Sequence, residues 1–433
     1  MKRICTFFAA LALLAAPHVH AQLGLPRVQV PLPSQLGPVD IGPLREPLRN
    51  PLDAVRDVSR LRLDTVTALL RRHPEVLEAD PRGEPAVRRE ILAFAPSPAG
   101  LAAAASLGMA VLRETGLGDG AGSMVVLGAP ATLPTAQALE RLRALDPDGI
   151  YDFNHIYTGS GAGGGGDAPT AAMPTRGIAD GMPAVGLVDS GVDDGHAALR
   201  EAAVRHWGCG GERKPAPHGT AVAALMVGQV LRFRGVHPGG RLYAADIYCD
   251  SPTGGSADRI AGALAWLSRE RIGVVNMSIV GPHNRMLEQV VGLMVKRGHL
   301  IVAAVGNDGP AAPPLYPASY PGVVGVTAVD KKGRPLPEAA RGPQVMFAAP
   351  GSNMVSADTA SGGFRQVRGT SFASPIVAAM LAAEAATPNP ALAKAALDRL
   401  ATRAQRDQAS TISNAVGFGI VGADYRTDPA RFR

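Results

Sequence analysis

Three polar residues of this chain have the types that a nucleophilic hydrolase needs, and they occur in the order Asp189, His218 and Ser371. A serine hydroxyl is a weak nucleophile until a neighbouring base takes its proton, and a histidine oriented by a carboxylate can act as that base. Each residue alone has a plainer explanation, because aspartate, histidine and serine also cap helices or stabilise turns. These three residue types are the ones that acyl transfer through a serine nucleophile requires.

The segment around the serine is the most specific of the three. Ser371 lies in Gly-Thr-Ser-Phe-Ala-Ser-Pro, residues 369–375, at the start of an Ala-rich stretch that we expect to be a helix over 371–386. Pro375 is tolerated only in the first turn of a helix, and Gly369 permits a sharp entry into it. The hydroxyl is therefore expected at a helix start.

A fourth segment supplies a candidate for stabilising negative charge. Asn307 stands between glycines after the apolar run 300–304, and its side-chain amide could donate to a developing oxyanion. The alternative is a turn asparagine in the left-handed conformation.

In this order the segments resemble the subtilisin-like serine proteases, or subtilases. The resemblance covers about residues 180–425 and includes Asn276-Met277-Ser278, Tyr316-Pro317-Ala318 and Ala349-Pro350-Gly351. It implies a catalytic triad of Asp189, His218 and Ser371. It also implies an oxyanion hole formed by the Asn307 amide and the backbone N–H of Ser371.

The resemblance also implies a substrate cleft. Residues 276–281 would pair with the substrate backbone and line the primary side-chain pocket, opposite residues 303–306. The substrate-binding residues expected on this basis are Ser278, Ile279, Val280, Ala304 and Gly306. Val280 stands where many family members have glycine, which should narrow or reshape this pocket.

The elements that position these residues follow from the apolar pattern. Strand candidates alternate with helical segments over about 250 residues, which predicts an α/β domain with a doubly wound, mainly parallel sheet. Such sheets carry their sites at the carboxyl ends of the strands. The strands are expected at 184–188, 241–248, 274–278, 300–304 and 323–328, and the helices at 218–230, 257–270, 284–297 and 371–386.

The N-terminal part divides into four segments. Residues 1–21 have the basic head, apolar run and small residues of a secretory signal peptide. Residues 22–87 are a Pro-rich leader followed by a helical pattern at 53–72, without an assigned role. Residues 88–158 follow a β-α-β-β-α-β order, and residues 159–180 are a Gly-rich linker. The peptidase domain is expected at 181–425, with a tail at 426–433.

The β-α-β-β-α-β segment resembles the inhibitor-type propeptide of the family, a small α+β ferredoxin-like domain. This implies that it assists folding and inhibits the enzyme within the same chain. Its last strand, expected at 150–157, would lead into the cleft, so the resemblance implies self-cleavage between Tyr157 and Gly166. Cleavage directly after Tyr157 conflicts with a pocket narrowed by Val280, whereas the residues from Thr158 to Gly166 are small.

Cysteine usage points to an oxidising compartment. Cys5 leaves with the signal peptide, and the remaining pair, Cys209 and Cys249, is expected to form a disulfide. Two free buried thiols are the alternative. We expect residence in the periplasm or outside the cell.

Other functions fit these residues less well than a peptidase does. An α/β-hydrolase needs its histidine after its serine, but the last histidine here is His299. The cluster of Asp189, Asp193, Asp194 and His196 lacks the ligand spacing of a calcium loop, so no metal site is predicted, although calcium itself stays possible. A catalytically silent subtilase fold that serves as a binding or scaffolding module is the remaining alternative.

Charge argues against one class of partner. The formal net charge is +6 and falls to +4 when Lys2 and Arg3 leave, which is too little and too scattered for nucleic-acid binding. We therefore expect protein and peptide substrates, a monomer, no cofactor, and no membrane association once the signal peptide is gone.

Overall fold

A seven-stranded parallel sheet is the centre of the larger domain in this computed structural model, which describes residues 62, 64–118, 120–159, 182–406 and 412–432. The strand order is β16-β15-β14-β12-β6-β10-β7, and every neighbouring pair is parallel. The strands are β6 Ala184–Asp189, β7 Ala203–Trp207, β10 Arg241–Asp246, β12 Val274–Met277, β14 Leu300–Ala304, β15 Val324–Val329 and β16 Val345–Pro350.

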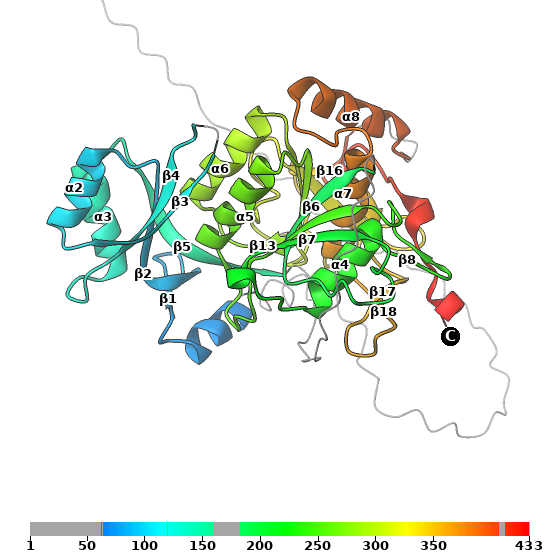
Figure 1. Ribbon diagram of the computed structural model, residues 1–433, viewed down its shortest axis with the longest axis horizontal. Coiled ribbons are helices and arrows are strands. Elements are labelled where there is room, and N and C mark those ends of the chain that lie inside the picture. The colour runs from blue at the N-terminus through cyan, green and yellow to red at the C-terminus, as the bar shows by residue number, and fades with distance from the viewer. Residues whose placement is uncertain (1–61, 63, 119, 160–181, 407–411, 433) are drawn as a thin grey trace, which may run out of the picture. The chain divides into compact units, whose positions relative to one another are not determined.

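Helices cover both faces of this sheet, as the α/β pattern predicts (Figure 1). Successive side chains of β6 alternate between two cores: Val185 and Leu187 pack with α4 and α7, whereas Val188 packs with α5 and α6. A strand buried on both sides needs a continuous apolar sequence, and β6 has one. The helices are α4 Pro217–Val227, α5 Ala257–Arg269, α6 Arg285–Lys296, α7 Ser374–Ala382 and, farther along the chain, α8 Pro390–Arg403.

The order of the strands creates a topological switch point. From β6 the chain passes to the edge strand β7, returns with β10 between β7 and β6, and then crosses to the other side of β6 with β12. Ligand sites of open parallel sheets lie at the carboxyl ends of the strands beside such a point. Asp189 is the last residue of β6, at that edge.

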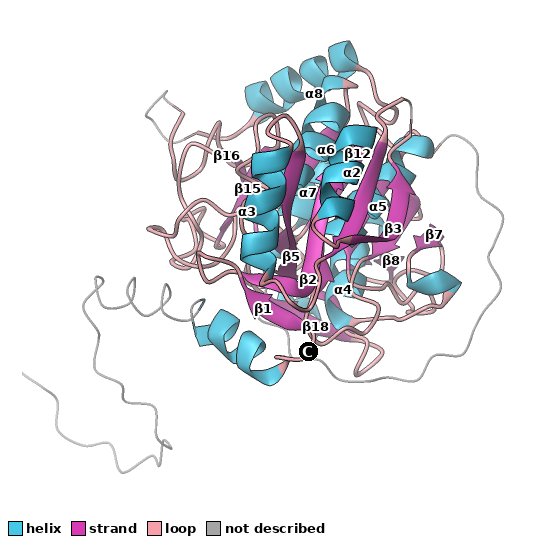
Figure 2. Cartoon of the chain, turned by 90° about the vertical axis from the view of Figure 1, so that its left-hand side faces the viewer, coloured by secondary structure: helices cyan, strands magenta, loops and turns pink. Residues whose placement is uncertain are grey.

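The N-terminal part is an antiparallel sheet with two helices. Its strand order is β5-β2-β4-β3, with β1 paired to β2, and α2 and α3 lie side by side across one face (Figure 2). The elements are β1 Leu77–Ala79, β2 Pro85–Phe94, α2 Pro98–Ser106, β3 Ala110–Gly116, β4 Ser123–Gly128, α3 Thr135–Leu145 and β5 Ile150–Gly159. The expected start of this domain at residue 88 falls inside β2, so the sheet begins earlier than the sequence suggested.

The second face of this small sheet packs on the larger domain. Leu92, Met124 and Val126 belong to the same buried cluster as Ile260 and Val290 of helices α5 and α6. These two helices therefore have apolar contacts with sheets on both sides. An apolar core therefore joins the N-terminal sheet to the larger domain.

Several elements of the larger domain lie outside the expected ones. Among the described residues they include β16, α8, the antiparallel pairs β8–β9 and β17–β18, the strand β11 that pairs with β5, and four 3₁₀ turns, whereas the short strand β13 lies within the predicted segment 276–281. The short strands are β8 Gln229–Val230, β9 Phe233–Arg234, β11 Gly255–Ser256, β13 Ile279–Val280, β17 Met354–Ala357 and β18 Phe364–Val367, and the 3₁₀ turns are η1 Cys209–Gly211, η2 Thr370–Phe372, η3 Ala423–Tyr425 and η4 Pro429–Phe432.

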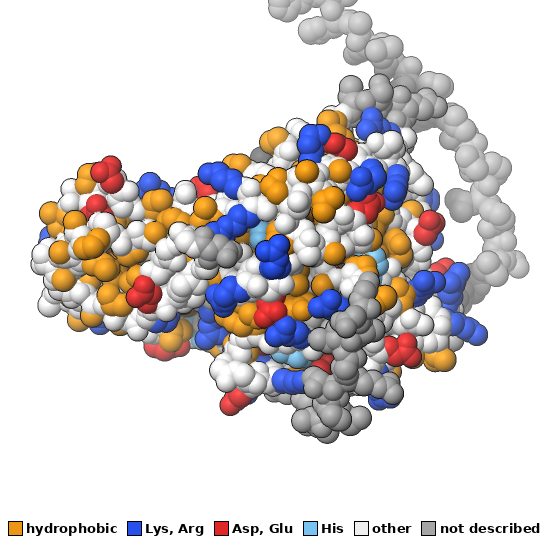
Figure 3. All heavy atoms as spheres, turned by 45° about the horizontal axis from the view of Figure 1, so that its top comes forward, with side chains coloured by type: hydrophobic (Ala, Val, Ile, Leu, Met, Phe, Trp, Pro, Cys, Tyr) orange, Lys and Arg blue, Asp and Glu red, His pale blue; other side chains and the backbone are white. Residues whose placement is uncertain are grey.

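Surface charge is mixed. Figure 3 shows Lys and Arg side chains interspersed with Asp, Glu and apolar side chains on the face that it presents. Within the described ranges, the helices all fall short of the length and apolar character that a membrane span requires.

Candidate active site

Asp189 presents a buried carboxylate at the end of β6. Its side chain is 1% exposed, and its Oδ1 accepts hydrogen bonds from the backbone N–H and the hydroxyl of Ser190, with N–O and O–O distances of 2.7 and 3.2 Å. Nδ1 of His218 lies 2.7 Å from the same oxygen. A buried carboxylate in this position orients the imidazole and favours a proton on Nδ1.

His218 lies in the first turn of α4, directly after Pro217. The helix start approaches the Asp189 turn very closely, because a Cβ on Gly219 would lie 2.1 Å from the backbone oxygen of Ser190. The N–H of Gly219 also donates to the Ser190 hydroxyl at 3.0 Å. Glycine is therefore required after the histidine. Nε2 of His218 is buried and has no hydrogen-bond partner among the described residues.

Ser371 lies in the 3₁₀ turn η2 rather than in the helix that the sequence predicted from residue 371. The helix α7 begins only at Ser374, and Pro375 occupies its first turn. Gly369 enters the turn with φ +132°, a conformation that favours glycine. The Ser371 side chain is fully buried, and its Oγ has no hydrogen-bond partner in the part of the chain that the structure describes.

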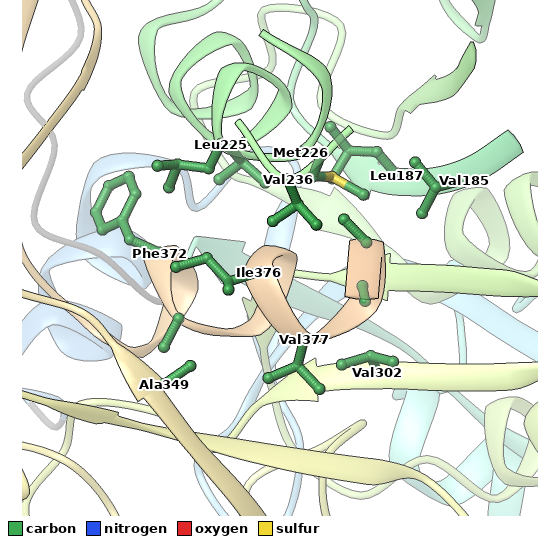
Figure 4. Close-up of a cluster of buried hydrophobic side chains, with 14 of the residues drawn as sticks. Val185, Leu187, Leu225, Met226, Val236, Val302, Ala349, Phe372, Ile376 and Val377 are labelled. Atoms are coloured by element: carbon green, nitrogen blue, oxygen red, sulfur yellow. The ribbon is translucent and has the colours of Figure 1, made fainter. Parts of the chain in front are cut away.

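The turn that carries Ser371 is anchored in the core. Phe372 and Ile376 lie on the side of α7 that faces Leu225 of α4, whereas Val377 lies on the opposite side, beside Val302, and all of them belong to one buried cluster (Figure 4). The Phe372 ring lies 5.5 Å from the His218 ring, centroid to centroid, so η2 and the start of α4 are direct neighbours. This contact brings the serine turn to the histidine.

A network of side-chain hydrogen bonds, centred on the Ser278 hydroxyl, holds the same turn. Ser278 donates to the backbone oxygen of Ser371 at 2.9 Å, and its Oγ lies 3.0 Å from the hydroxyl of Ser374. The Asn276 amide donates to that Oγ at 2.9 Å. Through these contacts the Ser278 side chain supports the serine turn, and its predicted place in the substrate cleft stays a prediction. Ser374 was missed as a partner, although it belongs to the motif around Ser371.

Asn307 directly follows Gly306, beyond the end of β14. Its Oδ1 accepts the backbone N–H of Thr370 at 3.0 Å, which fixes the amide orientation and places Asn307 beside the serine turn. Its Nδ2 is buried and lacks a partner among the described residues. A Cβ on Gly369 would lie 3.1 Å from this Nδ2, so the glycine leaves space at the amide. Asn307 does not adopt the left-handed conformation, and its geometry suits an oxyanion donor.

The cleft beside these residues holds β5 of the N-terminal domain. β5 pairs antiparallel with β11 on one side, Tyr157 opposite Gly255, and with β13 on the other, Thr158 opposite Val280. Ile279 of β13 lies opposite Gly159. β5 therefore lies between two short strands of the larger domain, as an added strand does in peptide recognition. The sequence expected pairing with residues 276–281 and missed β11.

The predicted pocket residues line up across the cleft. Ala304 ends β14, beside β12, and Gly306 follows it with φ +101°. A Cβ on Gly306 would lie 3.5 Å from Cγ1 of Val280, so the two predicted walls do face each other. Tyr157 lies elsewhere: its hydroxyl donates to the backbone oxygen of Pro282 at 2.7 Å.

The segment before the N-terminal domain also reaches the site. Residues 64–72 are helical, in agreement with part of the helix predicted over 53–72, whose first residues lie outside the described ones. Arg62 contacts Glu84 at 3.0 Å and Asp308, the residue after Asn307, at 3.4 Å. Burial raises the pKa of Asp308, and the Arg62 charge opposes that shift.

A cavity of about 600 Å³ lies beside these residues. It is lined by Arg62, Thr65, Val66, Leu69, Thr158, Gly159, Asn307, Gly369 and Phe372, among others.

A disulfide joins Cys209 and Cys249 in the structure, with their Cα atoms 5.2 Å apart. Asp246, the last residue of β10, lies beside it and is the strand partner of Asp189. Burial raises the pKa of Asp246, and the nearby Asp189 carboxylate adds to that shift. The sulfurs and an Asp246 oxygen lie within 4.8 Å of one another, but sulfurs joined as a disulfide are not available as thiolate ligands.

The acidic cluster after Asp189 is occupied by other contacts. Asp194 pairs with Arg213 at 2.7 Å and with His206 at 3.2 Å. Asp193 accepts the N–H of Gly195, and His196 contacts the backbone oxygen of Gly363 at 2.9 Å. Each side chain thus has a structural partner, and the cluster does not converge on one point.

Comparison with known proteins decides the family. A sequence model of the subtilase family matches residues 181–419, more than half of the chain. The chain belongs to the subtilase family. It is a serine-type endopeptidase, a hydrolase that acts on peptide bonds in proteins.

Individual subtilases are moderately similar. Subtilisin amylosacchariticus from Bacillus subtilis subsp. amylosacchariticus is 30% identical over 265 residues, which cover 58% of this chain and 68% of that protein. Subtilisin-like protease 1 from Trichophyton rubrum is 32% identical over 209 residues, or 45% of this chain and 40% of that protein.

A solved subtilase shares the fold. Fervidolysin from Fervidobacterium pennivorans, a keratinolytic enzyme related to subtilisin, aligns with a TM-score of 0.62 and 20% identity, covering 81% of this chain and 62% of its own. That share exceeds the span of the family match, so the likeness in fold extends beyond residues 181–419.

Proposed function

We propose that the protein is a secreted subtilase that hydrolyses peptide bonds through an acyl-enzyme on Ser371, and that it is made as a precursor that processes itself. One observation carries this proposal. Nε2 of His218, Oγ of Ser371 and Nδ2 of Asn307 are buried polar atoms without partners among the described residues. Such atoms are costly in a folded protein unless a ligand or a reaction uses them.

The chemistry assigns each atom a role. His218 takes the proton of the Ser371 hydroxyl as Oγ attacks the scissile carbonyl carbon, and Asp189 stabilises the imidazolium. The Asn307 amide and the backbone N–H of Ser371 stabilise the oxyanion. His218 then gives the proton to the leaving amine. Water hydrolyses the acyl-enzyme by the same steps, so the proposed reaction needs no cofactor.

The N-terminal segments support the precursor part of the proposal. The domain that ends with β5 would inhibit the enzyme within the same chain, since β5 occupies the cleft beside His218. Residues 1–21, whose structure lies outside the described residues, would direct export as a signal peptide. The mature enzyme would act outside the cytoplasm as a monomer.

A fluorophosphonate probe tests the proposal directly. It should label Ser371 of the mature protein covalently, and the Ser371→Ala variant should not react. A folded, secreted protein that neither reacts with the probe nor cleaves casein would instead be a catalytically silent binding module.

A further inference from the structure

The side chains of Leu315 and Val280 lie next to Gly306, in the wall of the predicted primary side-chain pocket. A Cβ built on Gly306 would meet Cδ1 of Leu315 at 2.5 Å and Cγ1 of Val280 at 3.5 Å. Val280 and Leu315 are 5% and 3% exposed, so both side chains lie inside the wall rather than at its rim. The space directly beside Gly306 is thus occupied by these two side chains, and Val280 also lines the cavity of about 600 Å³ described above.

The width of this space decides which residue can enter. A Cα–Cβ bond is about 1.5 Å long, so Cα of Gly306 lies at most about 5 Å from Cγ1 of Val280. A ring placed between two walls needs a van der Waals contact of about 3.5 Å on each side, or about 7 Å in all. The separation between Gly306 and Val280 is therefore too small for an aromatic ring to lie between them.

The strand that occupies the cleft agrees with this geometry. Its aromatic residue, Tyr157, is two positions before Gly159 and packs on Gly281, where an added Cβ would lie 2.4 Å from the ring. A Cβ on Gly159 would face His218, and side chains alternate along a strand. The residues that follow Gly159 in the sequence, Ser160-Gly161-Ala162, are all small.

We infer that Val280 and Leu315 restrict the residue before the cleaved bond to glycine, alanine or serine. The inference rests on the proposed function and names the substrate class of the same site. A substrate side chain that is too large for the pocket lowers the rate of cleavage and leaves the folding of the enzyme unaffected. Each substrate methylene that a closed pocket cannot hold typically lowers kcat/KM about tenfold or more.

A peptide series tests it. Fluorogenic peptides Ile-Tyr-Thr-Gly-X, which repeat residues 156–159, carry Gly, Ala, Ser, Leu or Phe as X. The mature wild-type enzyme should cleave the Ala and Ser peptides with kcat/KM at least about tenfold above the Leu and Phe peptides. Val280→Gly, Leu315→Ala and the double variant should raise the Phe-to-Ala ratio by a similar factor. Leu392→Ala, on the exposed side of α8, is the matched control and should leave the ratio unchanged.

The outcomes separate the two proposals. A wild-type enzyme that labels at Ser371 and cleaves the Phe peptide as fast as the Ala peptide overturns the restriction and leaves the proposed function intact. An unchanged ratio in the folded double variant overturns the roles of these two residues. If the variants do not fold, the wild-type profile alone decides. A protein that neither labels nor cleaves any peptide defeats the proposed function itself.

Discussion

Gly159 and His218 face each other across the cleft: a Cβ on Gly159 would lie 3.9 Å from Nε2 of the imidazole. Gly159 is the last residue of β5, which is held by β11 and β13. Up to Gly159, the chain therefore lies in the site as a substrate strand would. This relationship locates the bond that the enzyme should cut first.

Maturation should cleave the precursor between Tyr157 and Gly166, and the register of β5 favours the bond after Ser160. Mass spectrometry of the mature N-terminus measures this directly. A mature chain that starts before Ile150 or after Pro183 would contradict the domain boundaries proposed for the precursor.

Replacing Ser371 by alanine should abolish peptidase activity and leave the precursor at full length, because the same hydroxyl would cut both substrate and linker. Gel electrophoresis of the purified variant over several days checks this. Appearance of the mature form in a pure preparation, at the wild-type rate, would sink the self-processing part of the proposal.

Asn307→Ala should lower kcat with little change in KM, because the amide donor acts mainly on the oxyanion of the transition state. Loss of one such donor costs about 3 kcal/mol of barrier stabilisation, roughly a hundredfold or more in rate. Steady-state kinetics on a peptide substrate measure it. Asn414→Ala, at an exposed position of the C-terminal segment, is the control. A near-normal kcat for Asn307→Ala would remove this residue from the oxyanion hole.

The Cys209–Cys249 disulfide should form in the secreted protein and stabilise it. It closes a loop of 40 residues, worth about 4 kcal/mol in the chain-entropy model. Alkylation of the unfolded, unreduced protein should modify neither cysteine, and reduction should lower the urea midpoint. Two cysteines that react before reduction would refute the bond and return the pair, with Asp246, to the class of possible metal ligands.

The precursor should lose stability in acid partly through Asp80. Burial alone would raise the pKa of this carboxyl, but hydrogen bonds from His155 and from the backbone of Glu84 and Arg82 outweigh it and lower the pKa from 3.8 to about 2. Between these values the unfolded chain binds more protons, so stability rises with pH across this window. The contribution is complete above about pH 4 and disappears as the pH falls toward about 2.

The Ser371→Ala precursor provides a stable background for this measurement. Its thermal midpoint should exceed that of the additional Asp80→Asn variant at pH 5, and the difference should shrink toward zero at about pH 2. Asp148→Asn, at an exposed position, controls for the change of charge. A difference that stays constant from pH 5 to pH 2 would show that the ionised Asp80 carboxylate does not stabilise the precursor.

The sequence predicted most of the parallel sheet, because strands buried on both faces need uninterrupted apolar runs. β14 has the expected bounds, and β6 differs by one residue. The strands β17 and β18 were not predicted, since their residues alternate poorly and their pairing depends on a turn between them. The β-α-β-β-α-β order was also readable, but β1 and the first half of β2 were not, because Pro85 and the charged residues after it mask the strand pattern.

The sequence predicted which residues form the site, but it did not predict the contacts that hold those residues in place. Motif order points to the Asp189, His218 and Ser371 positions, and the structure places the first two in hydrogen-bond contact. Nothing in the local sequence joins Ser278 to Ser374, because a contact across 96 residues depends on the packing of α7 against β12. The position of Leu315 beside Gly306 could not be predicted from the sequence either, because it also depends on how the folded segments pack.

The two short strands that hold β5 have a consequence for the enzyme after maturation. Once β5 leaves, the backbone groups of β11 and β13 that face it would be exposed as two sheet edges, one strand width apart. Only a single extended segment whose backbone N–H and C=O groups are unpaired on both sides can bind between β11 and β13. A strand already paired within a native sheet, or a helix, cannot. We therefore expect the mature enzyme to discriminate by conformation, degrading unfolded chains and long loops while tightly folded neighbours remain intact.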